Sequence, residues 1–534
     1  MSTAYLVLLI LLAIYVPVYL WVRKNPDAAA KLHLAKYGPA LMIKTHLGIG
    51  LMGRLGRFQR FWRAFGFFSK LTSAVLLFLM MYMVIVALIN LPSTIGSRSI
   101  GIEYALAIPG FNPILPLSYG VVALVFAMVV HELAHGIQSR ANGIDVDSTG
   151  LLYGVIPLGA YVEPDEEQLK AAPRRPRVEV YAAGITSNTI FAIVAILLLS
   201  FSCSNIGSPY GDSPGVYSID EGSPALASGT PVTAIITGAM VVGSSDFEPV
   251  HAEMWGNSAS LAFTDPETGF DPTMDYVLQY EYKGTTAVSE PVQMGPYIKS
   301  VVKGSPAESA GAVYGEFIYS ITKGGVETLI GSLYEFMAYM SETSPGDAVI
   351  LSTVKAGDDR TPVYHEEVLL SSQNGKGFLG LSVTDGGFTL TTPDSLMHNA
   401  SSPFAAASGT PISYVKSLFS YLSGPFNGMS PVPDDVKWWY DAPIGEATWV
   451  LLSLLYWIFW LDILLAISNA LPAYPFDGGL LFAGWVDWVL EKSGRMDQER
   501  RQEVGGRISS AVSNVVLLMF VMLILAMVLR GGGI

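Results

Sequence analysis

The sequence predicts a polytopic α-helical membrane protein, with about six transmembrane helices and an inserted soluble α+β domain. Only 14% of the 534 residues are charged and 51% are hydrophobic, whereas a typical soluble domain is about 25% charged. The apolar residues are gathered into runs long enough to cross a bilayer, and most acidic residues lie in one central segment between such runs.

Six stretches reach the length of roughly 20 apolar residues that a helix needs to cross the hydrocarbon core. Four are almost uninterrupted and two contain polar residues. The six are residues 4–22, 71–91, 118–138, 181–202, 448–471 and 515–529 with its flanks. The first lacks the basic start and the small-residue cleavage site of a secretion signal, and Arg23 and Lys24 follow it, so we expect it to be a span.

The distribution of basic residues predicts the orientation, because loops rich in Lys and Arg stay in the cytoplasm. Ten Lys and Arg residues lie in 23–70, five in 140–177 and five in 492–507, but one in 92–117. Six spans then place the three basic loops in the cytoplasm and both termini outside. Residues 203–441 lie outside, with 27 acidic and 9 basic residues and a net charge of −18. This acidity argues against a nucleic-acid partner, which requires a basic face.

A short motif at the end of the third apolar run points to metal chemistry. Residues 131–136 read HELAHG, so His131 and His135 share one face of a helix. Two such imidazoles can bind one tetrahedral Zn²⁺, and Glu132 can take a proton from water on that ion as the water attacks a carbonyl. Ionisable residues after ten apolar ones are costly in hydrocarbon unless they bind a partner. We therefore interpret the histidines as ligands rather than as a helix surface.

A third ligand is expected from the last third of the chain. An apolar run over 448–468 leads into NALPAYPFDGG at 469–479. Two prolines break the helix there, and a Gly-Gly pair allows a tight turn. Irregular backbone at membrane depth must line a cavity or be buried in protein, which makes Asp477 a candidate third ligand. The alternative is a loop aspartate that caps a helix beginning at Leu480.

Together the two motifs resemble those of the site-2 protease family of intramembrane zinc metalloproteases. Gly184 and Asn188 match the family's G-x-x-x-N pattern, and residues 156–162 are similar to its membrane-associated β-loop. The resemblance covers both membrane blocks, 118–202 and 446–482.

The resemblance implies one Zn²⁺ held by His131, His135 and Asp477, with Glu132 as the catalytic base. It places Asn188 near the metal, where its amide would bind the substrate or the oxyanion; the alternative is a hydrogen bond between two helices. The implied reaction is hydrolysis of peptide bonds in or near transmembrane segments of membrane proteins, in regulated intramembrane proteolysis.

Asp462 departs from the family pattern and is left out of the predicted site. It stands seven residues before Asn469, where relatives often carry Asn. It could be a neutral, hydrogen-bonded group in the bundle or a group that supports the metal ligands.

The external segment contains two similar stretches, each with a Gly-Ser-Pro-Ala sequence followed by an apolar run and a glycine turn. The second, over 293–385, resembles a PDZ domain, with a helix expected over 333–340 and a strand over 348–354. The first is similar to a degenerate PDZ-like unit. Such units receive peptides along a strand, which would admit substrates already cut by another protease. The alternative is a rigid spacer.

The predicted organisation has six segments. They are an N-terminal membrane region (1–117), a catalytic membrane block (118–202), two PDZ-like extracytoplasmic units (203–292 and 293–400), a linker with an interfacial helix over 412–422 (401–445), and a C-terminal membrane block (446–534). The basic stretch 44–70 is expected either to lie on anionic lipid or to pack within the protein. Cys203 is the only cysteine, so no internal disulfide is possible.

The predicted protein is a multi-pass cell-membrane metalloprotease with its active site toward the cytoplasm. Three rival functions are a catalytically silent PDZ-containing scaffold that binds peptide tails, an ectopeptidase with an external metal, and a metal transporter. The intact HELAH motif argues against the scaffold. The apolar run before His131 argues against the ectopeptidase, and the clustering of polar residues argues against the transporter.

Overall fold

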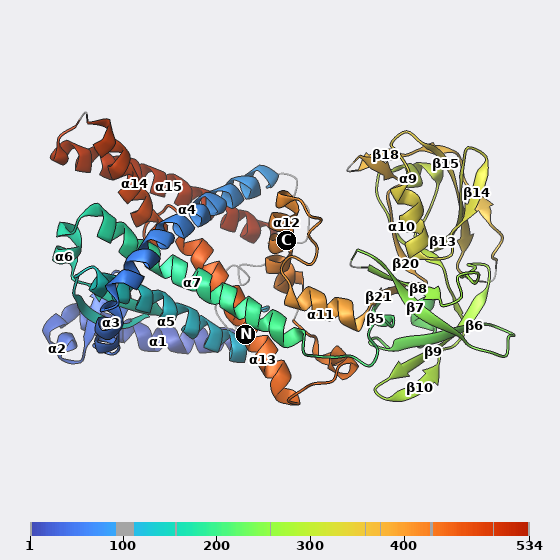
Figure 1. Cartoon of the computed structure of the whole chain (residues 1–534), viewed down its shortest axis with the longest axis horizontal. Helices are drawn as coiled ribbons and strands as arrows, with labels where there is room; N and C mark the ends of the chain where they lie inside the picture. The colour runs from blue at the N-terminus through green and yellow to red at the C-terminus, as the bar shows by residue number, and fades with distance from the viewer. Residues whose placement is uncertain are drawn as a thin grey trace. The chain divides into compact units, whose positions relative to one another are not determined.

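The computed structural model describes residues 3–91, 112–154, 157–256, 258–357, 359–373, 375–427, 431–494 and 496–531. The chain divides into two compact units, Met1–Leu199 with Leu451–Ile534, and Ser200–Val450. The first unit consists mainly of helices and the second mainly of strands (Figure 1). The finer division into six segments stays a prediction.

Five helices in the described part of the chain are long and apolar enough to cross a membrane. They are α4 (Gln59–Asn90), α5 (Leu117–Ala141), α7 (Arg174–Cys203), α13 (Glu446–Asn469) and α15 (Gln498–Gly531). Each contains one of the predicted apolar runs. The first predicted span falls in α1 (Thr3–Lys24), whose early side chains lie outside the described residues. A sixth span therefore stays a prediction.

Small residues let the helices of the first unit approach closely. Ala182 of α7, and Ala466 and Ala470 at the end of α13, are fully buried in one core with side chains of α4 and α15. Close backbone approach through small residues is the usual basis of helix packing in lipid. Large apolar side chains such as Phe67 and Phe78 of α4 are more than half exposed, as expected of surfaces that face hydrocarbon.

The chain breaks between α13 and the shorter helix α14 (Asp477–Ser493), as the two prolines predict. A Cβ on Gly478 would lie 2.4 Å from the backbone carbon and oxygen of Ala470, and one on Gly479 would meet Ala473 at 2.7 Å. Only glycine permits this approach. The break therefore fixes the start of α14, and with it Asp477, against the end of α13.

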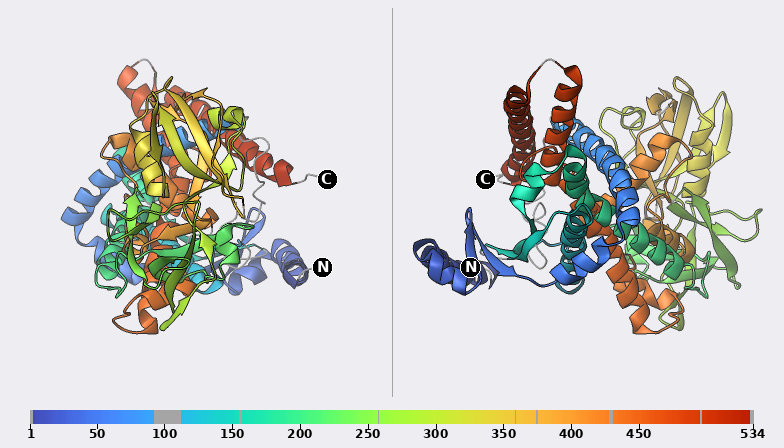
Figure 2. Two further views of the ribbon diagram at one scale, coloured as in Figure 1. Left: turned by 90° about the vertical axis from the view of Figure 1, so that its right-hand side faces the viewer. Right: turned by 60° about the vertical axis from the view of Figure 1, so that its left-hand side comes forward.

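A four-stranded antiparallel sheet lies in the first unit, with strand order β1-β2-β3-β4. The strands are β1 (Leu34–Tyr37), β2 (Ala40–Thr45), β3 (Val146–Tyr153) and β4 (Pro157–Pro164). The β3–β4 hairpin confirms the predicted β-loop, but the two N-terminal strands were not predicted. Figure 2 (right) shows α1 and α2 (Pro26–Lys31) beside this sheet, where Val22 and Ala29 form a small core with Leu41 of β2.

Within the basic stretch 44–70, one helix face packs against the protein and other side chains are exposed. The short helix α3 (Ile49–Gly56) places Met52, which is 3% exposed, in a core with Ile137 of α5. Leu47 and Leu51 are exposed. The packing alternative thus holds for one face of α3, and contact with lipid stays a prediction for the other face.

The second unit is built on a network of fifteen strands with a separate hairpin. The strands are β5 (Gly215–Ile219), β6 (Ile235–Val241), β7 (Glu248–Trp255), β8 (Ser258–Phe263), β9 (Asp275–Tyr282), β10 (Thr285–Val288), β11 (Val292–Gln293), β12 (Pro296–Val301), β13 (Glu316–Lys323), β14 (Val326–Leu329), β15 (Ala348–Lys355), β16 (Val363–Tyr364), β17 (Val368–Leu369), β18 (Ser371–Gln373), β19 (Lys376–Phe378), β20 (Leu381–Asp385) and β21 (Phe388–Thr391). The helices are α8 (Pro224–Ala227), α9 (Pro306–Ala310), α10 (Leu333–Ser341), α11 (Pro393–Ser401) and α12 (Pro411–Ser423), with 3₁₀ turns at Gly424–Asn427 and Asp434–Trp439. Helices α10 and α12 and strand β15 confirm the elements predicted over 333–340, 412–422 and 348–354.

The two Gly-Ser-Pro-Ala sequences fold in the same way. Ser223 and Ser305 cap α8 and α9, each accepting a backbone hydrogen bond three residues on. A glycine closes on each cap: a Cβ on Gly387 would lie 2.2 Å from Ser223, and one on Gly380 would lie 2.2 Å from Ser305. The second unit therefore contains a structural repeat.

The two copies are nested in the chain. The last strand of the first copy, β21, comes after the whole of the second copy. Strand β20 pairs with β12, and β21 pairs with β5. Equivalent backbone bonds join each cap to its closing strand, from Ala307 N–H to Leu379 and from Ala225 N–H to Gly386. Strand β21 thus completes the first copy, although it lies within the range predicted for the second. Whether the copies are PDZ domains stays a prediction.

Candidate metal centre

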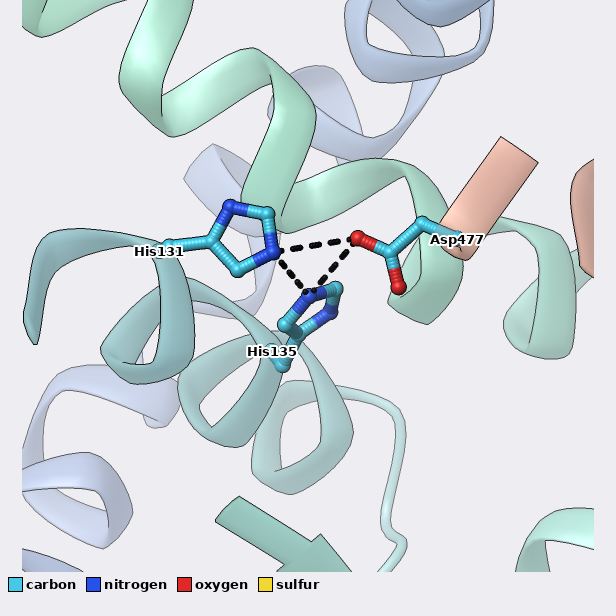
Figure 3. Close-up of side chains that lie close together, drawn as sticks. All are labelled: His131, His135 and Asp477. Atoms are coloured by element: carbon cyan, nitrogen blue, oxygen red, sulfur yellow. Dashed lines mark hydrogen bonds and ion pairs between the residues drawn. The ribbon is translucent and has the colours of Figure 1, made fainter. Parts of the chain in front are cut away.

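Two motifs more than three hundred residues apart meet in the first unit. His131, His135 and Asp477 each offer one ligand atom, and these atoms lie within 4.8 Å of one another. Figure 3 shows the two imidazoles and the carboxylate pointing toward one another, two from α5 and one from the start of α14. No other group of this kind occurs in the part of the chain that the structure describes.

The spacing of the three donor atoms fits a tetrahedral ion. His131 Nε2 lies 3.1 Å and His135 Nε2 3.2 Å from Asp477 Oδ2, and the two nitrogens are 3.2 Å apart. Ligands about 2.0–2.1 Å from a tetrahedral Zn²⁺ would be about 3.3–3.4 Å apart. Two imidazoles and one carboxylate, with a fourth position open, form a donor set suited to catalytic zinc. The residues therefore fit zinc without rearrangement.

Local geometry orients the two imidazoles. His135 Nδ1 lies 2.7 Å from the carbonyl oxygen of Val180 on α7. A carbonyl only accepts, so Nδ1 carries the proton, and a neutral ring then leaves the Nε2 lone pair for a metal. His131 Nδ1 is buried and finds no hydrogen-bond partner among the described residues.

Gly184 of α7 supplies the space that the imidazoles occupy. A Cβ at this position would lie 2.4 Å from His135 Nε2 and 2.6 Å from His131 Nε2. The sequence pattern pointed to Gly184 only through the family resemblance, whereas the structure gives a steric reason for glycine.

Glu132 is held by the small sheet. The backbone N–H of Val162 on β4 donates to Glu132 Oε2 at 2.9 Å. Asp145, Asp147 and Glu163 lie outside the three-residue group. Sequence reasoning missed the contact with Val162, although the predicted β-loop was the signal that a strand lies near the motif.

Asn188 lies on the same face of α7 as Gly184, one turn on. It is fully buried, and its Nδ2 donates to Ala127 O of α5 at 3.3 Å. Its Oδ1 has no partner among the described residues. The amide thus joins two helices, as the alternative interpretation proposed, and keeps one oxygen and one N–H for another partner.

Asp462 is fully buried in α13, and neither carboxylate oxygen has a hydrogen-bond partner in the described part of the chain. It does not belong to the three-residue group. Asp477 lies in the first turn of α14, and Phe476 precedes that helix without a side-chain cap. The carboxylate of Asp477 faces the histidines, because its Oδ2 lies 3.1 Å and 3.2 Å from their Nε2 atoms.

Comparison with known proteins identifies the family. The model described as Peptidase family M50 matches residues 119–518, most of the chain. An uncharacterised protein of Methanocaldococcus jannaschii is 43% identical over 93 residues, 17% of this chain and 25% of that protein. A protein named membrane-bound transcription factor site-2 protease homolog, from Arabidopsis thaliana, is 27% identical over 139 residues, 24% of this chain and 27% of that protein.

The chain therefore spans about a quarter of the length of these two curated relatives, while the family match extends over both membrane blocks and the segment between them. Members of this family are membrane-embedded zinc metalloproteases. The chain belongs to peptidase family M50, the site-2 protease family.

Proposed function

We propose that the protein is an intramembrane zinc metalloendopeptidase that cuts peptide bonds in or near transmembrane segments of membrane proteins. The observation that carries this proposal is the convergence of His131, His135 and Asp477, with donor atoms 3.1–3.2 Å apart. These three residues would hold one Zn²⁺. When bound, the ion would act as a Lewis acid and lower the pKa of water to about 7.

Each remaining residue of the site has a proposed task. Glu132, next to His131, accepts a proton from water and passes it to the leaving amine. The Val162 N–H orients the carboxylate that performs this transfer. Asn188 binds the substrate backbone or the developing oxyanion with the part of its amide that Ala127 does not use.

The substrate must expose a peptide bond that a helix normally protects. Backbone groups of a transmembrane helix are satisfied within the helix, so the scissile segment has to unwind before Glu132 can act on it. We propose that the repeats of the second unit select substrates trimmed by another protease, as in regulated intramembrane proteolysis. Strand β20 pairs with β12 on one edge, and its Ser382, Val383 and Thr384 line a cavity of about 470 Å³ that Leu333 of α10 also lines.

The proposed topology has six spans, with the second unit outside the cell and the metal centre toward the cytoplasm. Three basic loops and the net charge of −18 over 203–441 support it. The six-segment division and the PDZ-like nature of both repeats belong to the same proposal.

The test is the paired measurement of zinc content and cleavage for wild type and Glu132→Ala in detergent or liposomes, with a model membrane protein as substrate. We expect the variant to keep one zinc per chain and to lose cleavage by at least about a hundredfold, since general acid–base catalysis contributes typically 10²–10⁴-fold. Normal cleavage by Glu132→Ala would show that the proposed base is wrong. A wild type that binds zinc and cleaves nothing would favour the silent scaffold.

A further inference from the structure

A second cavity in the first unit, whose lining includes none of the three candidate metal ligands, carries a surplus of positive charge. It has a volume of about 730 Å³ and lies between the first turns of α7, the outer half of α14 and the first turns of α15. Five cations and two carboxylates line it. They are Lys170, Arg174, Arg175, Arg177, Arg501, Asp487 and Glu491. We call this cavity the basic pocket.

Most of these charges are already paired. Arg501 lies 3.0 Å from Asp487 and 3.6 Å from Glu491, and Arg174 pairs with the same two carboxylates. Arg175 pairs with Glu179 at 2.8 Å. The two carboxylates of the pocket are therefore satisfied by two arginines and leave no negative charge for a third.

Arg177 is the cation without a counter-charge. No ion pair joins it to any described residue, and its Nε is buried without a hydrogen-bond partner. A buried guanidinium nitrogen that lacks a partner is costly, because desolvation of a charged donor is uncompensated. Arg177 therefore leaves the pocket with one positive charge that no described carboxylate balances.

The position of the basic pocket indicates where a balancing negative charge would come from. Helix α7 has 30 residues, and the part of α15 from Gln498 to Ala526 has 29. Each is about 45 Å long at 1.5 Å per residue, whereas the hydrocarbon core is about 30 Å thick. The charged residues of both helices that line the pocket lie in the first turns, so we expect these turns to extend into the headgroup layer. Val178, Leu480 and Ala483 give the pocket an apolar wall beside its charges, which suits a phosphate attached to a glycerol backbone.

We infer that the basic pocket binds the phosphate headgroup of one anionic phospholipid, with Arg177 as its principal ligand. Guanidinium groups bind phosphate through charge-assisted, often paired hydrogen bonds. Both α7 and α14 run from this pocket to the metal centre, since Gly184 of α7 touches the imidazoles and Asp477 begins α14. A bound headgroup would hold the outer turns of these two helices together.

The test is lipid binding by the purified full chain in a neutral detergent, followed by native mass spectrometry. The probes are dihexanoyl phosphatidylglycerol, dihexanoyl phosphatidylcholine and inorganic phosphate at matched ionic strength. Wild type should bind one phosphatidylglycerol in preference to the other two probes. Arg177→Gln should weaken this binding about tenfold, the effect of losing a hydrogen bond to a charged group, and Arg177→Lys should weaken it less.

The matched control is Arg60→Gln, which removes one charge from an exposed position of α4 that makes no ion pair in the described residues. Zinc content and melting temperature without added lipid show whether each variant is folded. If Arg60→Gln weakened phosphatidylglycerol binding as much as Arg177→Gln, the effect would come from surface charge alone and the proposed site would be wrong. Equal binding of phosphatidylcholine, or saturation by inorganic phosphate alone, would overturn the lipid assignment. None of these measurements depends on proteolysis.

Discussion

Gly184 determines how closely α7 approaches the two imidazoles, because a methyl group there would lie only 2.4 Å and 2.6 Å from their Nε2 atoms. Gly184→Ala should displace both rings and reduce cleavage by at least about a hundredfold, since misplacement by 1 Å can have an effect of this size. Zinc content should fall as well. Gly50→Ala is the control, because a Cβ there meets nothing within 4 Å. A Gly184→Ala enzyme with normal zinc content would refute the steric role.

Removal of zinc should be reversible, because the apo site retains partners for its three ligands. Without the ion, Asp477 Oδ2 still lies 3.1 Å from His131 Nε2 and 3.2 Å from His135 Nε2, within hydrogen-bonding distance of both. We therefore expect a chelator to abolish cleavage and leave the helical signal in circular dichroism unchanged, with recovery on addition of Zn²⁺. Asp477→Asn should prevent recovery at the zinc concentration that restores wild type. Loss of the helical signal with the metal would contradict this.

The three candidate ligands were predictable from residue type, spacing and the family resemblance, whereas the backbone groups that support them were not. His131 and His135 follow from a helical motif, and Asp477 from a carboxylate beside a helix break. The Val180 carbonyl and the Val162 N–H are backbone groups. Almost any residue type at these positions would supply them, so the sequence does not mark them. Gly184 carried a signal only through the family pattern.

At the scale of elements, β4 is an edge strand whose Val162 N–H points away from β3 and holds Glu132. Proline is tolerated on an edge strand where its nitrogen faces outward. Val162→Pro should therefore keep the sheet and zinc content but lower kcat about tenfold, through loss of one charge-assisted hydrogen bond. Ala160→Pro, two residues earlier on the same edge, is the matched control. Equal effects of both prolines would show that the strand, rather than the bond to Glu132, matters.

Asp385 links the two copies of the repeat, since it accepts hydrogen bonds from Leu261 N–H of β8 and Leu333 N–H of α10. Burial raises the pKa of Asp385 to about 6, against the hydrogen bonds from Leu333, Ser260 and Leu261, which lower it. The folded state then binds the proton more tightly than the unfolded state. Its contribution to stability is full below about pH 4 and is lost as the pH rises through about 6, by about 3 kcal/mol.

The measurement is the melting temperature of the second unit in full-length wild type and Asp385→Asn at pH 4 and pH 7. The amide does not titrate, so the advantage of wild type over the variant should shrink as the pH rises. An advantage that grows with pH would mean that the hydrogen bonds outweigh burial.

Element positions were largely predictable, and their pairing was not. Apolar length predicted five helices, and the resemblance of residues 293–385 to a PDZ domain predicted α10 and β15. Strands β1 and β2 were missed because residues 34–45 mix charged and apolar side chains without clear alternation. Pairing between β2 and β3 joins segments about a hundred residues apart, and local patterns carry no information about such a partner.

At the scale of the whole molecule, the proposed topology can be tested by labelling single cysteines. The native Cys203 is 3% exposed, so wild type should give little signal with a membrane-impermeant maleimide. Ser371→Cys in the second unit should be labelled in intact cells. Glu167→Cys, exposed at the start of α6 (Glu166–Ala171), should be labelled only after permeabilisation. Labelling in the reverse pattern would invert the orientation.

The nested repeat has a consequence for synthesis of the chain. A ribosome releases β12 to β20 in sequence, so the inner copy can close as soon as Asp385 has emerged. The outer copy begins at β5 but is completed only by β21, the strand that pairs with it. The 168 residues between Ile219 and Phe388 are translated while that edge of β5 stays open. An unpaired edge is a site for mispairing with other chains. In the proposed topology, in which the second unit is exported, β5 would therefore be open to mispairing until Phe388 follows it across the membrane.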